Sequence, residues 1–216
     1  SDFLVDLEKL YMNCLYNLDN VYSFNGNTTA FVEMEDGINE YGLSVGLTFI
    51  YPTIIKAGFN AGLLVRYLLE KCRTTNEAIQ TLKQIPIASQ QTLTIADNTG
   101  NIAVVECNAE NVEVIKANEK DNFVIATNEF SSENMKKYNN YNIDDWKAEE
   151  RYNVGYNALV TNKNNFSFDL AKDILSGKYG FMCQYDRKTN ADTVWSVIYD
   201  IKNKKVYRVE GNPSRK

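Results

Sequence analysis

The sequence of 216 residues contains no histidine. This absence excludes the Ser-His-Asp and Cys-His nucleophile systems, HExxH zinc sites and every histidine general base. The four cysteines lie in apolar surroundings without CxxC spacing, at Cys14, Cys72, Cys107 and Cys183. This pattern is typical of reduced thiols in an intracellular protein rather than of a disulfide framework or a zinc site. If the protein is an enzyme, we therefore expect a base other than histidine, no metal and no cofactor.

One amide side chain stands out by its place in the sequence. The stretch FVIATNEF, residues 123–130, runs from four apolar or small residues into Thr127 and Asn128. Asparagine commonly ends strands because it tolerates turn conformations. Whether Asn128 has a chemical role as well depends on what the rest of the chain indicates.

Composition restricts the classes of protein that need to be considered. With 44% hydrophobic and 24% charged residues the chain has the values of one ordinary globular domain. It has no run of about 18 uncharged apolar residues that could span a bilayer. The net charge of −5, with basic residues scattered among acidic ones, argues against a nucleic-acid partner. We expect a soluble, cytoplasmic protein of one domain, residues 1–216, that binds neither membrane nor nucleic acid.

Sequence patterns in the first half of the chain predict several of the helices and strands that would position a site. Apolar residues near helical spacing predict a short helix over residues 4–14, with Cys14 on its apolar face. Two strands are predicted at Thr28–Met34 and Leu43–Tyr51, with Asp36-Gly37 as the turn between them. Helices follow over residues 60–72 and from a cap at Thr75 to the turn before Pro86.

The second half returns to strands and then to helices. Predicted strands lie at Thr92–Ala96, Ala103–Cys107, 111–115 and Phe123–Thr127, and a polar loop is expected over Ser131–Asp145. Helices are predicted over Trp146–Val160 and Phe168–Leu175, followed by a closing hairpin over 192–211. Strand blocks that alternate with helix pairs indicate an α+β fold in which helices pack on largely antiparallel sheets.

Five segments together resemble one family. They are DGINEYGLSVGLTF, GLLVRYLLEKCRTTNEAIQTLKQIP, LTIADNTGNIAVVE, ATNEF and TVWSVIYDIKNKKVYRVEGNP. In this order, over about nine-tenths of the chain, they are similar to the acyl-CoA:6-aminopenicillanic acid acyltransferase-like group of linear-amide hydrolases, relatives of the choloylglycine (bile salt) hydrolases. The resemblance implies an N-terminal nucleophile hydrolase fold, an αββα four-layer sandwich. It also implies a mechanism in which an N-terminal cysteine attacks an amide and its own α-amine is the base, so that no histidine is needed.

The resemblance implies catalytic roles for three residues, each with a structural alternative. Asn128 matches the asparagine whose side chain helps to hold the oxyanion, although it could simply end a strand. Asp2, in the pair Asp2-Phe3, matches the aspartate that orients the nucleophile's amine, and is about equally well explained as a helix N-cap. Arg151 occupies the place of the family's helix-borne arginine near the active site, or is an exposed partner of neighbouring charges such as Glu150.

The chain also departs from the family pattern. The family's nucleophilic cysteine, its strand and the Arg-Asn of its Arg-Asn-x-Asp motif should precede Asp2, so we expect them outside this N-terminally truncated sequence. Ser1 has a hydroxyl and a free amine, which this chemistry can use in principle, but it is adjacent to Asp2 rather than a strand away. Cys14 is better explained as a core residue.

Two functions remain open from the sequence. The leading hypothesis is the C-terminal major part of a linear-amide C–N hydrolase or acyltransferase, inactive by itself, with a small-molecule amide or acyl compound as substrate. An N-terminal fragment or a second copy of the chain is the expected protein partner. The alternative is a non-catalytic small-molecule-binding or interaction protein that retains the fold.

Overall fold

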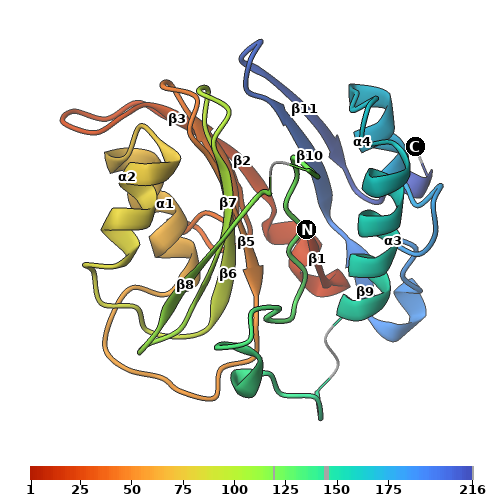
Figure 1. The fold of residues 1–216 in the computed structure, drawn as a ribbon, viewed down its shortest axis with the longest axis horizontal. Coiled ribbons are helices and arrows are strands. Elements are labelled where there is room, and N and C mark those ends of the chain that lie inside the picture. The colour runs from red at the N-terminus through yellow and green to blue at the C-terminus, as the bar shows by residue number, and fades with distance from the viewer. Residues whose placement is uncertain (119, 144–145, 216) are drawn as a thin grey trace.

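Four layers of secondary structure lie side by side in the computed structural model, which describes residues 1–118, 120–143 and 146–215 (Figure 1). Two helices cover one large sheet, two short sheets lie on its other face, and two further helices form the fourth layer. The strands are β1 (Asp2–Leu4), β2 (Met12–Tyr16), β3 (Phe24–Thr28), β4 (Asp36–Asn39), β5 (Ser44–Phe49), β6 (Gln91–Ala96), β7 (Ile102–Cys107), β8 (Val112–Lys116), β9 (Ala191–Thr193), β10 (Trp195–Asp200) and β11 (Lys205–Glu210). The α-helices are α1 (Ala61–Lys71), α2 (Thr75–Leu82), α3 (Ala148–Thr161) and α4 (Phe168–Leu175).

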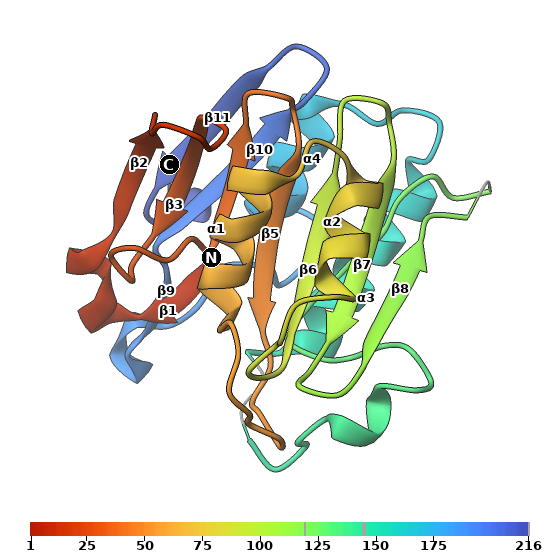
Figure 2. The same ribbon diagram turned by 90° about the vertical axis from the view of Figure 1, so that its left-hand side faces the viewer.

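The large sheet is an antiparallel meander in the order β2-β3-β4-β5-β6-β7-β8. Helices α1 and α2 cover one face of it, as Figure 2 shows. The apolar side chains between these helices and the sheet are buried, among them Leu64, Leu68, Leu93 and Ile95, each 0% exposed. Gly37 of β4 is required here, because an added Cβ would lie 2.6 Å from Leu69 Cδ1 and 2.8 Å from the Asn25 carbonyl oxygen. This core fixes the sheet that carries one wall of the site.

The second layer of strands consists of two short antiparallel pairs, β1 with β9 and β10 with β11. A buried polar cluster joins it to the large sheet. The Asp36 carboxylate of β4 accepts hydrogen bonds from Trp195 Nε1 at 2.7 Å, from Asn27 Nδ2 at 2.6 Å and from the Tyr199 hydroxyl. Burial, and then the neighbouring Asp36 carboxylate, raise the pKa of Tyr199 well above its ordinary 10, so this hydroxyl stays a donor. A fully satisfied buried network of this kind fixes how the two sheets face each other.

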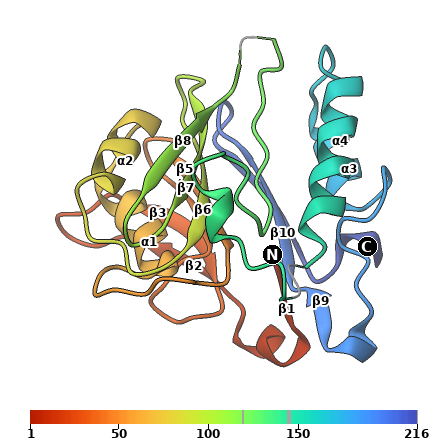
Figure 3. The same cartoon turned by 60° about the horizontal axis from the view of Figure 1, so that its bottom comes forward.

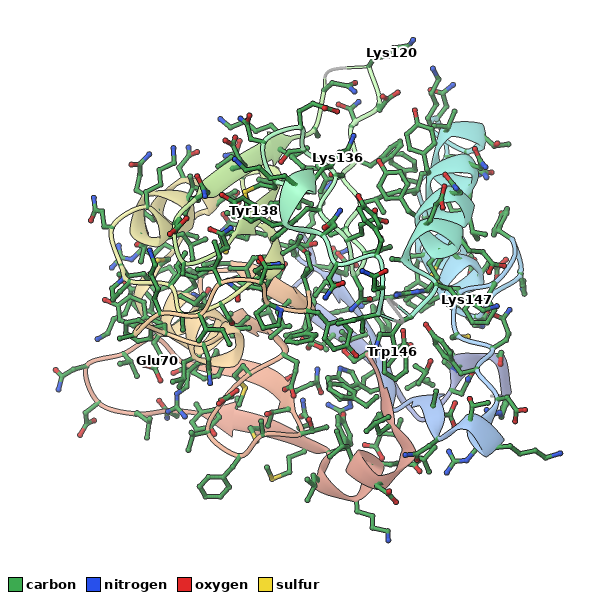
Figure 4. All side chains as sticks on the ribbon, turned by 90° about the horizontal axis from the view of Figure 1, so that it is seen from below. Glu70, Lys120, Lys136, Tyr138, Trp146 and Lys147 are labelled. Atoms are coloured by element: carbon green, nitrogen blue, oxygen red, sulfur yellow. The ribbon has the colours of Figure 1, made fainter. Side chains whose placement is uncertain are left out.

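Helices α3 and α4 lie on the side of β10 that faces away from the large sheet (Figure 3). Helix α3 begins at Ala148, two residues after its predicted start, because Trp146 and Lys147 have left-handed backbone with φ of 60° and 57°. Figure 4 shows these two residues beside the N-terminal end of α3. Several other predictions are confirmed, namely the strand inside Leu43–Tyr51, the helix at 60–72, the 92–107 hairpin, the strand at 111–115, helix α4 and the closing hairpin. The second helix also forms, but Thr74 rather than Thr75 caps it. Asp145 and its neighbour, at the end of the predicted loop over Ser131–Asp145, lie outside the described residues.

The predicted N-terminal helix over residues 4–14 is wrong. This segment forms strand β1, a 3-10 helix over Val5–Leu10 and strand β2. The 3-10 helix buries no residue, so the apolar spacing has no core to face. Pairing of β1 with β9 and of β2 with β3 decides the conformation instead, and the partners of β1 are about 190 residues away. Cys14 lies in β2 and packs against the main core.

Two predicted strands are wrong as well. Of Thr28–Met34 only the first residue is in a strand, and the predicted turn at Asp36-Gly37 lies inside β4, where the polar cluster and the approach of α1 outweigh local turn preference. Phe123–Thr127 forms no ladder beyond an isolated bridge between Thr127 and Glu129. Its apolar side chains pack toward α3, since Phe123 stacks edge to face on Tyr156 with ring centroids 5.8 Å apart.

Candidate active site

Asp2, Asn128 and Arg151, the three residues singled out in the sequence, meet at one cavity of about 470 Å³. They come from three separate parts of the chain, strand β1, the loop after residue 127 and helix α3. The other lining residues are Ser1, Phe3, Glu33, Glu35, Leu47, Thr48, Phe49, Asn60, Ala61, Gly62 and Ser89. The cavity thus lies between the large sheet with the start of α1 on one side and β1 with α3 on the other.

Arg151 links the other two residues. Its Nη2 donates to Asn128 Oδ1 at 2.5 Å, and its Nη1 lies 3.6 Å from Asp2 Oδ2. A third contact, from Nε to the Trp146 carbonyl at 2.8 Å, uses the carbonyl that the left-handed turn before α3 presents. Arg151 is only 9% exposed. The alternative of an exposed ion-pair partner is therefore wrong, and Glu150 pairs with Lys147 instead, at 3.3 Å.

Asp2 is held in place from the β9 side. Its Oδ1 accepts from Thr193 Oγ1 at 2.6 Å, and Thr193 is also its partner in the β1–β9 ladder. The Asp2 side chain is 15% exposed. Asp2 lies in strand β1, and Leu4 is the N-cap of the 3-10 helix that follows, with no side-chain capping hydrogen bond, so the N-cap alternative is wrong.

Strand β9 is itself anchored by a second aspartate. Asp192 accepts hydrogen bonds from Arg215 Nη1 at 2.8 Å, Asn212 Nδ2 at 3.0 Å and Arg187 Nη1 at 2.5 Å. Burial raises the pKa of Asp192, but these hydrogen bonds outweigh burial and lower the pKa from 3.8 to about 2. The strand that orients Asp2 is therefore fixed by a carboxylate that is ionised at neutral pH.

The side chain of Asn128 is oriented by two partners. Arginine can only donate, so the contact with Arg151 places Oδ1 on that side. Nδ2 donates one hydrogen to the Phe49 carbonyl at 2.8 Å, and among the described residues it has no second acceptor, so an oxygen atom bound in the cavity that Asn128 lines could accept the other hydrogen. Because no strand precedes Asn128, ending a strand does not explain its position.

Glu106 holds the loop that follows Asn128. This carboxylate on β7 is 1% exposed and accepts from the backbone N–H groups and the hydroxyls of Ser131 and Ser132. The shortest of these hydrogen bonds, from the Ser131 N–H and from the Ser132 hydroxyl, are both 2.6 Å. A satisfied buried carboxylate of this kind makes the loop part of the rigid frame.

Two cavity residues were missed in the sequence, Glu33 and Glu35. Glu33 accepts from Asn60 Nδ2 at 2.6 Å, and Glu35 from the N–H and hydroxyl of Thr29 at 3.0 and 2.8 Å. Burial raises the pKa of Glu35 against the effect of those hydrogen bonds. The spacing Glu33-Met34-Glu35 is the available signal, but the predicted strand Thr28–Met34, which does not form, includes Glu33 and ends before Glu35.

The described part of the chain contains no side-chain cluster of the kind that holds a metal ion, no membrane-spanning helix and no disulfide. Among those residues no group of three or more histidine, cysteine, aspartate or glutamate side chains could hold a metal ion. No helix there is long and apolar enough to cross a membrane. All four cysteines are free thiols, and none of them lines the cavity.

The layered fold is shared with solved amide hydrolases. Penicillin V acylase from Agrobacterium tumefaciens superposes with a TM-score of 0.65 at 15% identity over 88% of this chain, which spans 66% of that one. The Caenorhabditis elegans ortholog of N-acylethanolamine-hydrolyzing acid amidase gives a TM-score of 0.65 at 16% identity and covers 97% of this chain and 93% of its own. A mutant of conjugated bile acid hydrolase from Clostridium perfringens gives a TM-score of 0.63 at 16% identity. The superposition covers 92% of this chain and 78% of the hydrolase. No curated protein sequence matches the chain.

The fold is that of the N-terminal nucleophile hydrolases, as the sequence predicted, with its α+β layers in αββα order. Residues 3–215 match the family described as Acyl-coenzyme A:6-aminopenicillanic acid acyl-transferase. The chain belongs to that family, whose members and structural relatives are amide hydrolases and acyltransferases.

Proposed function

We propose that this chain forms the substrate cleft and most of the catalytic site of a linear-amide C–N hydrolase or acyltransferase whose nucleophile is an N-terminal cysteine outside the 216 residues. The observation that carries the proposal is the Arg151 side chain, which joins Asp2 and Asn128 at one cavity. Chemistry on an amide needs an oxyanion donor and an oriented nucleophile close together. These are the two tasks that Asn128 and Asp2 would perform.

The proposed reaction uses these residues in two steps. The thiol attacks the amide carbonyl carbon and passes its proton to the α-amine of the same cysteine, while Nδ2 of Asn128 donates to the oxyanion. Collapse of this intermediate breaks the C–N bond, and the leaving amine takes that proton. Water or a second amine then cleaves the thioester, which gives hydrolysis or acyl transfer. Asp2 would accept a hydrogen bond from the cysteine's amine, and Arg151 positions both side chains.

The first strands suggest where the nucleophile would lie. The amino group of Ser1 donates to the Trp195 carbonyl at 2.8 Å and so continues the β1–β9 ladder toward β10. A segment joined to Ser1 would run antiparallel along β10, beside the cavity that Ser1 lines. The same strand edge could be covered by a separate N-terminal fragment or by a second copy of the chain.

One observation favours the second function, a non-catalytic small-molecule-binding protein. No cysteine within the described residues lines the cavity, and Ser1 is its only terminal hydroxyl with an amine. Under this reading the cavity binds an amide-like compound and releases it unchanged.

Release of free amine from simple N-acyl amines separates these functions. We would compare the 216-residue chain, its Ser1→Ala variant and a version extended upstream to the nearest cysteine. The proposal expects turnover only from the extended protein, with loss of turnover when that cysteine is replaced by alanine. Turnover by the short chain that Ser1→Ala abolishes would assign the nucleophile to Ser1, and turnover that survives this change would refute the proposed mechanism.

The role of Asn128 has a matched control. In an active extended protein Asn128→Ala should lower kcat about 10²- to 10³-fold, the usual effect of removing one oxyanion donor. Asn157→Ala, on the exposed face of α3, should leave kcat unchanged. An equal effect of the two substitutions would remove Asn128 from the mechanism.

A further inference from the structure

The charges around the cavity are unevenly distributed. Three carboxylate residues line it, Asp2, Glu33 and Glu35, together with Arg151, while the amino group of Ser1 is hydrogen-bonded to the Trp195 carbonyl. Arg151 is 3.6 Å from Asp2, so these two charges offset each other at one end. Within the described part of the chain neither Glu33 nor Glu35 forms an ion pair. The other end of the cavity therefore has an excess of negative charge.

Both glutamates are held by neutral donors that leave their charge in place. Asn60, the N-cap of α1, donates to Glu33 Oε1, and the other oxygen lies against Gly62 in the first turn of that helix. The helix N-terminus offsets part of the Glu33 charge. Thr29 donates to Glu35 through its N–H and its hydroxyl. Behind Glu35, the Asp36 carboxylate adds to the negative potential.

Strand β5 gives the distance between the two ends. The Leu47 N–H donates to the Glu35 carbonyl at 2.8 Å, and the Phe49 carbonyl accepts from Asn128 at 2.8 Å. Two residues along a strand span about 7 Å. The backbone of Glu35 and the Asn128 amide are thus about 7 Å apart along β5, and this separation sets the scale at which a substrate held at Asn128 by its carbonyl oxygen can reach the glutamates.

We propose that the cavity selects amides carrying an ammonium group about 7 Å from the scissile carbonyl, such as monoacylated diamines, and disfavours amides with a carboxylate at that position. The proposal rests on the proposed function for the placement of the carbonyl. A compact, strongly hydrated ammonium suits two carboxylates that form no ion pair with any described residue, whereas a substrate carboxylate would meet like charge. Four methylenes beyond the amide nitrogen span about 7 Å when extended, which makes 1,4-diaminobutane the matching amine.

Three probes that differ only in their terminal group test this selectivity. They are N-hexanoyl-1,4-diaminobutane, N-hexanoyl-4-aminobutanol and N-hexanoyl-4-aminobutyrate. Calorimetric titration of the 216-residue chain measures binding, and amine release by the extended protein measures kcat/KM. We expect the order ammonium, alcohol, carboxylate in both measurements, with about tenfold between successive probes. An equal or reversed order, or no binding of any probe at millimolar concentration, would overturn the proposal.

Charge-neutral variants locate the effect. Glu33→Gln and Glu35→Gln should each weaken binding of the ammonium probe about tenfold and leave the alcohol probe within about twofold. Glu110→Gln removes the same charge from an exposed ion pair with Lys56 outside the cavity, and should change neither. Circular dichroism checks folding of each variant, and if Glu35→Gln does not fold, Glu33→Lys must reverse the preference between ammonium and carboxylate.

The outcomes separate this proposal from the proposed function. Preferential binding of the ammonium probe without turnover by the extended protein would refute the mechanism and keep the selectivity. If the extended protein turns over the carboxylate probe in preference to the others, and neither glutamate substitution changes this preference, the mechanism would be kept and the selectivity refuted.

Discussion

Replacement of Arg151 by alanine removes the side chain that holds the candidate site together. The substitution deletes the donor to Asn128 Oδ1, the donor to the Trp146 carbonyl and the cation beside Asp2. It leaves a carboxylate that is 15% exposed without its cation. The carboxylate keeps two hydroxyl donors, Thr193 Oγ1 at 2.6 Å and the Tyr185 hydroxyl at 3.4 Å.

The magnitude follows from these contacts. A hydrogen bond from a charged donor contributes about 1.5–3 kcal/mol, and breaking a partly buried pair also leaves the remaining group unsatisfied. Because the side chain lines a cavity, water can replace part of what is lost, so we take about 3 kcal/mol for the three contacts together. For a domain of this size each kcal/mol shifts Tm by about 2–4 °C, so Tm should fall by about 6–12 °C.

Urea denaturation and thermal unfolding of Arg151→Ala measure this effect. Lys147→Ala is the matched control, because its ion pair with Glu150 is more than half exposed at both ends and contributes about 0–1 kcal/mol. Arg151→Lys keeps the charge but loses the planar fork, so it should fall between the two. A double-mutant cycle with Asp2→Asn should give a coupling of about 1 kcal/mol. The reasoning is refuted if Arg151→Ala destabilises no more than Lys147→Ala, or if the cycle shows no coupling.

Three further predictions concern the frame of the site. Because the pKa of Asp192 is depressed to about 2, its ionised carboxylate stabilises the protein above about pH 4, and this contribution is lost as the pH falls through 2. In Asp192→Asn the unfolding free energy, measured by denaturant titration, should therefore fall less steeply between about pH 4 and pH 2 than in the unchanged protein. Gly37→Ala should destabilise the protein by about 1–3 kcal/mol, because the added Cβ would clash with backbone and with a core leucine. Gly46→Ala is the control and should cost about 1 kcal/mol or less, because the nearest atom to its added Cβ would be 3.8 Å away. Equal effects of the two substitutions would contradict the packing argument. Glu106→Ala should speed amide hydrogen exchange at residues 131–132 more than in β7, and unchanged exchange there would show that this carboxylate does not hold the loop.

The sequence alone determined the elements in which the local apolar pattern matches the surface that the element packs against in the fold. The apolar spacing at 60–72 carries its own cap, Asn60, and buries its stripe against the nearest sheet, so local signals suffice for α1. The hairpin of β6 and β7 has a turn signal between two β-type runs. The five motifs also predicted the family that the match over residues 3–215 shows.

Tertiary structure decided the elements whose partners are distant in sequence. The segment after Ser1 has helical spacing, yet it pairs with strands that no local window contains. Phe123–Thr127 has the composition of a strand, but its side chains pack against helix α3 and its backbone does not pair with a neighbouring strand among the described residues. Because the hydrophobic effect is not directional, the apolar residues of both segments can be buried against either a strand or a helix. The conformation of each segment therefore depends on which element packs against it in the folded protein.

The candidate site divides in the same way. Motif positions singled out Asp2, Asn128 and Arg151, but the sequence left a structural alternative open for each. Only the folded chain brings Arg151 within hydrogen-bonding distance of Asn128 and places Glu33 and Glu35 in the same cavity. Sequence thus fixed the chemical groups, since they are properties of single residues. Their distances and shared charge depend on the packing of four layers, and these only the tertiary structure could set.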